Sequence, residues 1–302
     1  MSDTTTGQPS SPLLGTPLVD VQGKPDARKL AIDRVGVKNV RYPISLATPT
    51  RGDGIEPGAH AGPRQHTVAR IDMYVSLPHH QKGTHMSRFL EVLNEHHEGI
   101  PSHDVMNLCR AVRERLEAED AHLRLEFPYF IDKVAPVSGQ PGKLDIEVVL
   151  EAHASANEPG PEDSIGPDTP GFTMTVRVPA TSLCPCSKEI SAYGAHNQRC
   201  EMEASVRFFP GKRMWIEDLF AVVESCASTQ VFSTLKRPDE KFVTEAAYDN
   251  PKFVEDIVRD LAMAMEADDR VAWYRVGSEN FESIHSHNAY AQLEHAKAVP
   301  AP

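Results

Sequence analysis

Apolar and polar residues alternate along several stretches of the chain, a pattern that predicts half-buried β-strands. In the clearest stretch, apolar residues at every second position share one face: Ala69, Ile71, Met73, Val75 and Leu77. We predict strands at 67–77, 143–152, 172–179, 202–208, about 270–277 and about 283–292. Strands are therefore expected in both halves of the chain.

Apolar residues at helical spacing predict helices between these strands. The predicted helices are 87–99, 102–119, about 215–228 and about 251–267, and Ser102 is the expected N-cap of the second. Each half then has the order strand, strand, helix, helix, strand, strand. This order predicts an α+β protein of two similar modules, each an antiparallel sheet covered on one face by a pair of helices.

Two stretches rich in small, polar and turn-forming residues mark boundaries in the chain. Residues 1–30 have little periodicity and are expected to form a disordered arm. The segment NEPGPEDSIGPDTPG at 157–171 is expected to be a linker loop. The predicted modules are therefore 31–156 and 172–294, the second carrying the candidate metal site, and a tail follows at 295–302.

The composition of the 302-residue chain, with 40% hydrophobic and 25% charged residues, is that of a soluble globular protein. No apolar run approaches the roughly 20 residues that cross a bilayer, and the N-terminus lacks a secretory signal, so we expect a cytoplasmic protein without a membrane partner. The net charge of −12 argues against nucleic acid as a partner. In a reducing compartment the five cysteines are expected to be thiols.

The segment LCPCSKEISAYGAHNQR at 183–199 places two thiols, Cys184 and Cys186, close to the imidazole of His196. A metal site, a redox pair and unligated buried residues are the alternatives. If the segment is extended, residues two apart point to the same side, which would present both sulfurs to one point. Thiolate and imidazole are the ligands that zinc favours, and without a second cysteine pair the site would be open, as in catalytic zinc sites.

Two further polar clusters carry candidate chemistry. In the segment 235–260, basic residues that could meet an anion precede Glu240, and Glu255 lies beside the apolar stripe of the predicted helix. A solvated helix end is the alternative reading of that segment. The segment ESIHSHNAY places His285 and His287 on one face of the last predicted strand, where half-exposed surface residues are the alternative to ligands.

Five motifs in one order resemble those of the type IB GTP cyclohydrolases, a prokaryotic family, and the similarity runs from about Asp33 to Glu294. The motifs are KGTHMSRFLEVL, LCPCSKEISAYGAHNQR, LKRPDEKFVTE, YDNPKFVEDIVRD and SIHSHNAYA. The resemblance implies the tunnelling fold, in which paired modules associate around a channel with active sites between subunits. It also implies a reaction in which GTP and water give formate and 7,8-dihydroneopterin triphosphate, the first step towards folate-type pterins.

The resemblance assigns roles to single residues. Cys184 and His196 are implied metal ligands, with Glu240 as the third. Such a metal, zinc, manganese or iron(II), lowers the pKa of bound water, which can then attack C8 of guanine. Glu255 is implied to hold the guanine edge through two hydrogen bonds, and His285 to move protons at the reacting end.

Cys186 is implied to be catalytic through hydrogen bonding or proton transfer if Glu240 completes the metal site. The candidates for the triphosphate are Lys188, Arg199, Lys236, Arg237, His85 and Arg88. The predicted partners are GTP and further copies of the chain in a homotetramer. Two alternatives stay open: a non-catalytic purine- or pterin-binding protein with a structural zinc site, and an enzyme acting on a different pterin or purine.

Overall fold

A computed structural model describes residues 20–49, 64–95, 105–157 and 169–298 of the chain. Most of the predicted arm and linker, the expected N-cap Ser102 and the last residues of the predicted tail lie outside the described residues. Within those that are described, no helix is long and apolar enough to cross a membrane.

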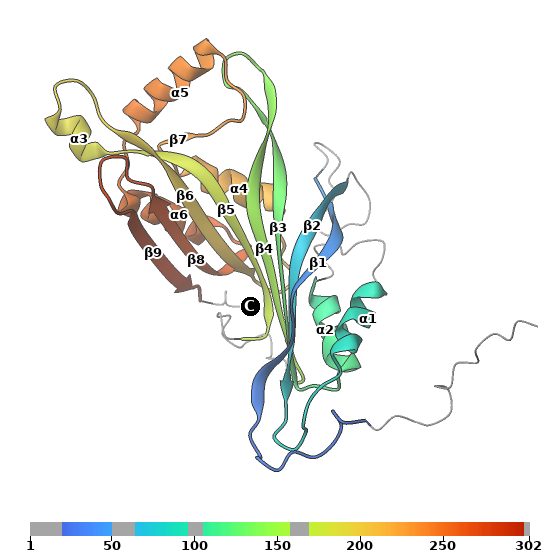
Figure 1. Cartoon of the computed structure of the whole chain (residues 1–302). Coiled ribbons are helices and arrows are strands. Elements are labelled where there is room, and N and C mark those ends of the chain that lie inside the picture. Colours follow the sequence, from blue (N-terminus) through green and yellow to red (C-terminus); the bar gives the residue numbers. More distant parts are fainter. Residues whose placement is uncertain (1–19, 50–63, 96–104, 158–168, 299–302) are drawn as a thin grey trace, which may run out of the picture.

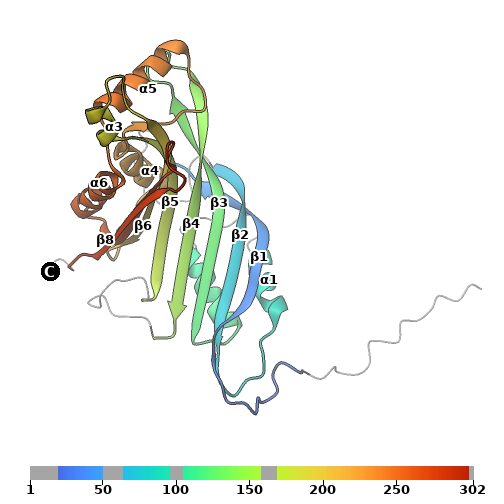
Figure 2. The same ribbon diagram turned by 60° about the vertical axis from the view of Figure 1, so that its left-hand side comes forward.

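The described strands form one antiparallel sheet (Figures 1 and 2). The strands are β1 (Ile32–Ala47), β2 (Arg64–Leu77), β3 (Asp120–Val134), β4 (Pro141–Ser155), β5 (Gly171–Leu183), β6 (Asn197–Phe208), β7 (Thr229–Gln230), β8 (Val271–Asn280) and β9 (Ala289–Ala296). Their order in the sheet is β1-β2-β3-β4-β5-β6-β8-β9, and β7 pairs with β5. The expectation of a separate sheet in each module was wrong, because β4 pairs with β5 and joins the two halves.

The helices lie beside the sheet in two groups, α1 and α2 at the first half and α4 and α6 at the second (Figure 1). Two further helices, α3 and α5, lie beyond the ends of β5 and β6. The helices are α1 (Met86–Asn94), α2 (Val105–Arg115), α3 (Pro185–Ile190), α4 (Ile216–Ser225), α5 (Arg237–Asp249) and α6 (Val254–Ala267). Each half thus contains the predicted order of two strands, two helices and two strands, with α3, β7 and α5 inserted in the second. The module boundaries themselves stay a prediction.

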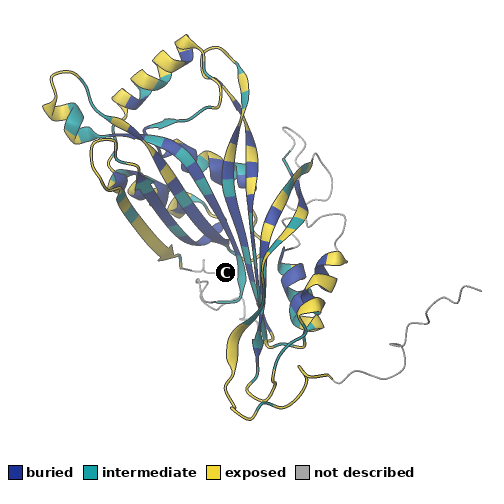
Figure 3. Ribbon diagram, viewed as in Figure 1, coloured by how far each residue is buried: buried dark blue, intermediate teal, exposed yellow. Residues whose placement is uncertain are grey.

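The alternation of the strands separates a buried face from an open one (Figure 3). Buried apolar partners run in register across the middle of the sheet: Leu125 faces Leu150, Leu150 faces Met174, and Met174 faces Val206. These residues belong to one core cluster with the apolar sides of the helices. On the open face, charged side chains pair across strands, as Arg177 does with Glu203 at 2.7 Å. One core therefore serves both halves.

At two places that affect the candidate site, the structure is not extended where an extended segment was considered or predicted. β5 ends at Leu183, and Pro185 begins α3, so Cys184 and Cys186 do not lie on an extended strand. Proline suits the first position of a helix because its fixed φ is already helical and its missing N–H is not needed there. The last strand begins only at Ala289, so His285 and His287 lie in the loop 281–288 rather than on a strand.

Candidate active site

Cys184 and His196 lie next to each other where β5 ends and β6 begins. Leu183 and Asn197 are the last paired residues of these strands, and beyond them the backbone N–H of Cys184 donates to the carbonyl of His196 at 3.1 Å. Both residues are half-buried. The hairpin therefore brings together a thiol and an imidazole that are twelve residues apart in the chain.

Ser187 connects the two residues a second time. Its backbone N–H donates to Sγ of Cys184 at 3.5 Å, so Cys184 is the N-cap of α3. Its hydroxyl accepts a hydrogen bond from the backbone N–H of His196 at 3.2 Å. The first turn of α3 thus holds Cys184 and His196 in one hydrogen-bonded unit, in a place where no helix was predicted.

The ring of His196 is held from β6 and from the loop 281–288. Nδ1 of His196 lies 2.7 Å from Oε1 of Gln198 and 3.2 Å from Oγ of Ser283. Gln198 is buried, and its Nε2 donates to Glu282 at 3.2 Å. Among the described residues, no hydrogen bond engages Nε2 of His196, which leaves that nitrogen for a metal ion.

The loop 281–288 also carries His285, the predicted proton-transfer residue. His285 is exposed, and its ring stacks on that of His287 with the ring centroids 5.3 Å apart. The loop begins where the backbone N–H of Phe281 donates to the carbonyl of Arg199. His285 therefore belongs to the segment that contacts His196, although the structure places it in a turn.

The start of α6, which carries Glu255, is bonded to the end of β5. The backbone N–H of Lys252 donates to the carbonyl of Leu183 at 3.0 Å, and the hydroxyl of Ser182 donates to the carbonyl of Lys252 at 2.9 Å. Glu255 lies in the first turn of α6 and is exposed. The structure thus brings the predicted guanine residue to the same end of the sheet as Cys184.

Glu240 does not join Cys184 and His196. It is exposed in the first turn of α5, whereas α3 contacts the last turn of α5, where Nζ of Lys188 donates to the carbonyl of Tyr248 at 2.5 Å. Eight residues of helix separate the two turns by roughly 12 Å. No group of three or more His, Cys, Asp or Glu side chains within the described ranges could hold a metal ion. Cys184 and His196 carry a sulfur and a nitrogen of the kinds that zinc favours as ligands.

The predicted triphosphate residues are dispersed. Lys188 is engaged with Tyr248, over whose ring its Nζ lies 4.3 Å from the centroid. Lys236 and Arg237 are exposed at the start of α5. His85, which faces Asp20 at 3.4 Å, lies with Arg88 at α1, at the opposite end of the molecule from α3 (Figure 1). One chain does not gather these groups.

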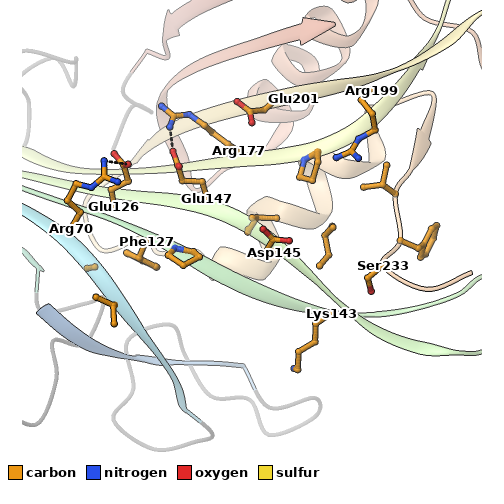
Figure 4. A pocket seen from close by; sticks show the side chains of 18 of the residues that line it. Arg70, Glu126, Phe127, Lys143, Asp145, Glu147, Arg177, Arg199, Glu201 and Ser233 are labelled. Atoms are coloured by element: carbon orange, nitrogen blue, oxygen red, sulfur yellow. Dashed lines mark hydrogen bonds and ion pairs between the residues drawn. The ribbon is translucent and has the colours of Figure 1, made fainter. Parts of the chain in front are cut away.

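Arg199 projects onto the open face of the sheet, into a cavity of about 610 Å³ (Figure 4). Charged side chains of both signs line this cavity. Arg70 pairs there with Glu126 at 3.3 Å, and burial raises the pKa of Glu201. The lining includes Arg199 but none of the predicted metal or guanine residues.

Asp239 is a buried residue of the segment RPDE at 237–240, and no role was predicted for it. Its Oδ1 accepts hydrogen bonds from the backbone N–H groups of Val137 and Ser138, both at 2.8 Å, and its Oδ2 accepts from the Ser138 hydroxyl and from the N–H of Lys236. Burial alone would raise the pKa of this carboxyl, but these hydrogen bonds hold the pKa well below its usual range. Asp239 therefore fastens α5 to the turn between β3 and β4.

Sequence reasoning missed Gln198, Glu282, Ser187 and Asp239. One signal could have revealed Gln198: it occupies a buried position in the alternation of β6, where Cys200 and Met202 follow on the same face. A polar residue at such a position needs partners. Cys200 itself is 1% exposed.

Comparisons with known proteins agree with this architecture and define a class. The solved structure of a uricase from Bacillus fastidious superposes with a TM-score of 0.51, covering 88% of this chain and 93% of that chain at 8% identity. At that identity the likeness concerns the fold alone. Together with the antiparallel sheet and its helices, it identifies an α+β tunnelling fold, as the sequence predicted.

The chain belongs to the GTP cyclohydrolase FolE2 family. A family model described as type I GTP cyclohydrolase folE2 matches residues 18–291. GTP cyclohydrolase FolE2 of Magnetococcus marinus is 53% identical over 92% of this chain and 96% of its own length. That of Nitrosococcus oceani is 47% identical over 96% and 99%. The resemblance to a type I GTP cyclohydrolase is confirmed; the matched family is FolE2, and none of these descriptions names the subtype IB.

Proposed function

We propose that the ends of β5 and β6, with the loop 281–288 and the start of α6, form the catalytic end of a GTP cyclohydrolase of subtype IB. The enzyme converts GTP and water to formate and 7,8-dihydroneopterin triphosphate in folate biosynthesis. The observation that carries the assignment is the hydrogen-bonded unit of Cys184 and His196, whose ring contacts the loop that bears His285. Membership of an enzyme family favours this function over a non-catalytic binding protein.

Cys184 and His196 are the proposed ligands of a divalent zinc, manganese or iron ion. When bound, such an ion supplies an acidified water for attack on guanine C8. Glu240 is retained as the proposed third ligand, and its distance along α5 requires that α5 approach the pair or that a second copy of the chain provide the carboxylate. Sulfur, nitrogen and oxygen donors together suit each of the three metals.

The remaining roles are assigned to groups of this chain near that end. The Glu255 carboxylate accepts hydrogen bonds from the N1–H and amino group of guanine, which adenine cannot offer in that pattern. His285 moves a proton as formate leaves. Cys186 is exposed in the first turn of α3, where its thiol can hydrogen-bond the reacting purine. Of the candidate basic residues, Lys236 and Arg237 are exposed beside Glu240 and are our first choice for the triphosphate.

The homotetramer and the cytoplasmic location remain part of the proposal. Glu255 and His285 are both exposed in the single chain, whereas a pocket that discriminates guanine must exclude water from its hydrogen bonds. Association of copies would provide that cover. It would also allow His85 and Arg88, distant from Cys184 in one chain, to serve the site of a neighbouring copy.

The decisive test uses the full chain, freed of metal and then supplied with zinc, manganese or iron(II) in the presence of GTP. Formate and pterin fluorescence are the readouts, and bound metal is measured in parallel. Cys184→Ala and His196→Ala should each lose metal and turnover while circular dichroism stays unchanged. His79→Ala, an exposed histidine after β2, is the matched control. Full metal occupancy in either active-site variant would contradict the ligand assignment.

A further inference from the structure

We propose that Gln198 is a positioning residue that fixes the tautomer and orientation of His196, and that Glu282 in turn fixes the orientation of Gln198. This inference rests on the proposed role of His196 as a metal ligand. The inference concerns Nδ1 of His196, the ring nitrogen that would not bind the proposed metal. No role was predicted for Gln198 from the sequence.

The chain of hydrogen bonds has a single consistent direction. A carboxylate only accepts hydrogen bonds, so the atom of Gln198 that faces Glu282 at 3.2 Å is its amide nitrogen. The amide oxygen must then face His196, where it lies 2.7 Å from Nδ1. An oxygen acceptor at that distance requires a proton on Nδ1. The lone pair of the neutral imidazole is therefore on Nε2, which is the nitrogen without a partner among the described residues.

Burial makes this direction difficult to reverse. Gln198 is only 6% exposed, on the core face of β6. A buried amide that loses its partners pays the cost of desolvation without compensation, so both ends of Gln198 must stay bonded. Turning the amide by half a rotation would point its oxygen at the Glu282 carboxylate, where two acceptors would oppose each other. Through the buried amide of Gln198, Glu282 therefore determines which ring nitrogen of His196 carries the proton.

The same contacts place the loop relative to the proposed metal. Glu282 bonds Gln198, and the next residue, Ser283, contacts Nδ1 of His196 with its hydroxyl at 3.2 Å. His285 follows two residues later. Since Gln198 lies on a strand in the middle of the sheet, it gives the loop a fixed point beside His196. Groups behind a metal-bound histidine commonly set its orientation and its basicity in this way.

The test compares Gln198→Met, which keeps the length of the side chain and removes both hydrogen bonds, with Glu282→Ala, which changes only the half-exposed loop residue. Gln292→Met, on the exposed strand β9, is the matched control. Zinc affinity is measured by competition with a chromophoric chelator. The tautomer of His196 is read from long-range ¹H–¹⁵N couplings in metal-free protein labelled at histidine.

In the wild-type protein we expect one tautomer of His196, protonated at Nδ1. Gln198→Met should give a mixture of tautomers and a zinc affinity that is about 10- to 100-fold lower, as for other groups behind metal ligands. Glu282→Ala should shift the tautomer in the same direction with a smaller loss of affinity, and it keeps the test valid if Gln198→Met does not fold. Gln292→Met should match the wild-type protein.

Two outcomes would overturn the inference: a wild-type His196 protonated at Nε2, or a wild-type tautomer and zinc affinity in Glu282→Ala and in the folded Gln198→Met variant. Failure of the proposed function looks different. It would appear as full zinc binding by His196→Ala, whatever the tautomer of His196 in the other variants. A loss of zinc in His196→Ala combined with wild-type behaviour of both positioning variants would refute the role of Gln198 alone.

Discussion

Replacing Lys133 by methionine should destabilise the fold strongly, because it leaves the carboxylate of Glu224 buried without its cation. Lys133 on β3 and Glu224 on α4 form an ion pair in which the side chains are only 7% and 6% exposed. Nζ of Lys133 also donates to the carbonyl of Val231 at 2.9 Å and lies 4.1 Å from the centroid of the Phe232 ring. The pair thus ties the hairpin of the first half to the helix layer of the second.

The loss of stability depends on which group is left without a partner. Removing one member of a buried ion pair typically costs about 3–5 kcal/mol. Burial already raises the pKa of Glu224, so the lone carboxyl would take up a proton more readily, which places the expected cost near the lower end of that range. The double variant Lys133→Met with Glu224→Leu removes the Lys133 donor from two half-buried acceptors, the Val231 carbonyl and Oε1 of Gln230, at a cost of about 1–3 kcal/mol.

Urea unfolding followed by circular dichroism at neutral pH measures these differences, with zinc removed so that ligand binding does not contribute. Lys241→Met is the control, because Lys241 is exposed on α5 and its pair with Glu245 lies at the surface. A loss below about 1 kcal/mol for Lys133→Met, or a double variant no more stable than the single one, would refute the reasoning that the buried charge dominates.

Three further outcomes are expected. Burial, and next the nearby His153, lower the pKa of His122 to about 4 from the ordinary 6.5, so the stability that His122 contributes is full above pH 6.5 and declines towards pH 4. The variant His122→Asn should therefore show a smaller dependence of stability on pH in urea unfolding at a series of pH values. An unchanged pH dependence would contradict this prediction. The pKa of Asp239 is depressed below 3.8, so its contribution to stability is present above that pH and is lost on further acidification. Asp239→Asn should be less stable than the wild-type protein at neutral pH, and the difference in stability should become smaller below about pH 3.8. Equal stability of the two proteins at neutral pH would exclude the anchoring role. Glu255→Gln should weaken GTP binding about 10- to 100-fold at unchanged metal content, as measured by calorimetry and metal analysis; unchanged affinity would remove Glu255 from the pocket.

Most of the sheet could be predicted from the sequence because its strands alternate strongly, as β2 does from Ala69 to Leu77. α5 could not, since only Asp239 and Ala247 of its residues are buried, which leaves no apolar stripe for a periodicity to reveal. The loop 281–288 was misread as strand because alternation of small and polar residues does not distinguish a turn from an exposed edge. The pairing of β4 with β5 depends on contacts across the linker, which no local pattern records.

The candidate site was predictable only in part, for a related reason. Cys184 and His196 share one hairpin, so closeness in sequence became closeness in space. Glu240 belongs to an inserted helix whose position is set by the contact of Asp239 with the β3–β4 turn, far away in the sequence. Gln198 could not be recognised from its residue type, because an uncharged amide differs from the thiols, imidazoles and charged groups that mark a candidate site. Its importance follows from its burial.

The joining of β4 to β5 has a consequence for how the molecule comes apart. Seven register pairs, from Glu147 with Arg177 to His153 with Gly171, run along this seam, and the core beneath them is shared. Separating the halves would expose two long, apolar strand edges at once, each a template for aggregation. The duplicated pattern in the sequence therefore does not amount to two independent folding units. Loss of structure should be a single cooperative event, and either half expressed alone should associate through its open strand.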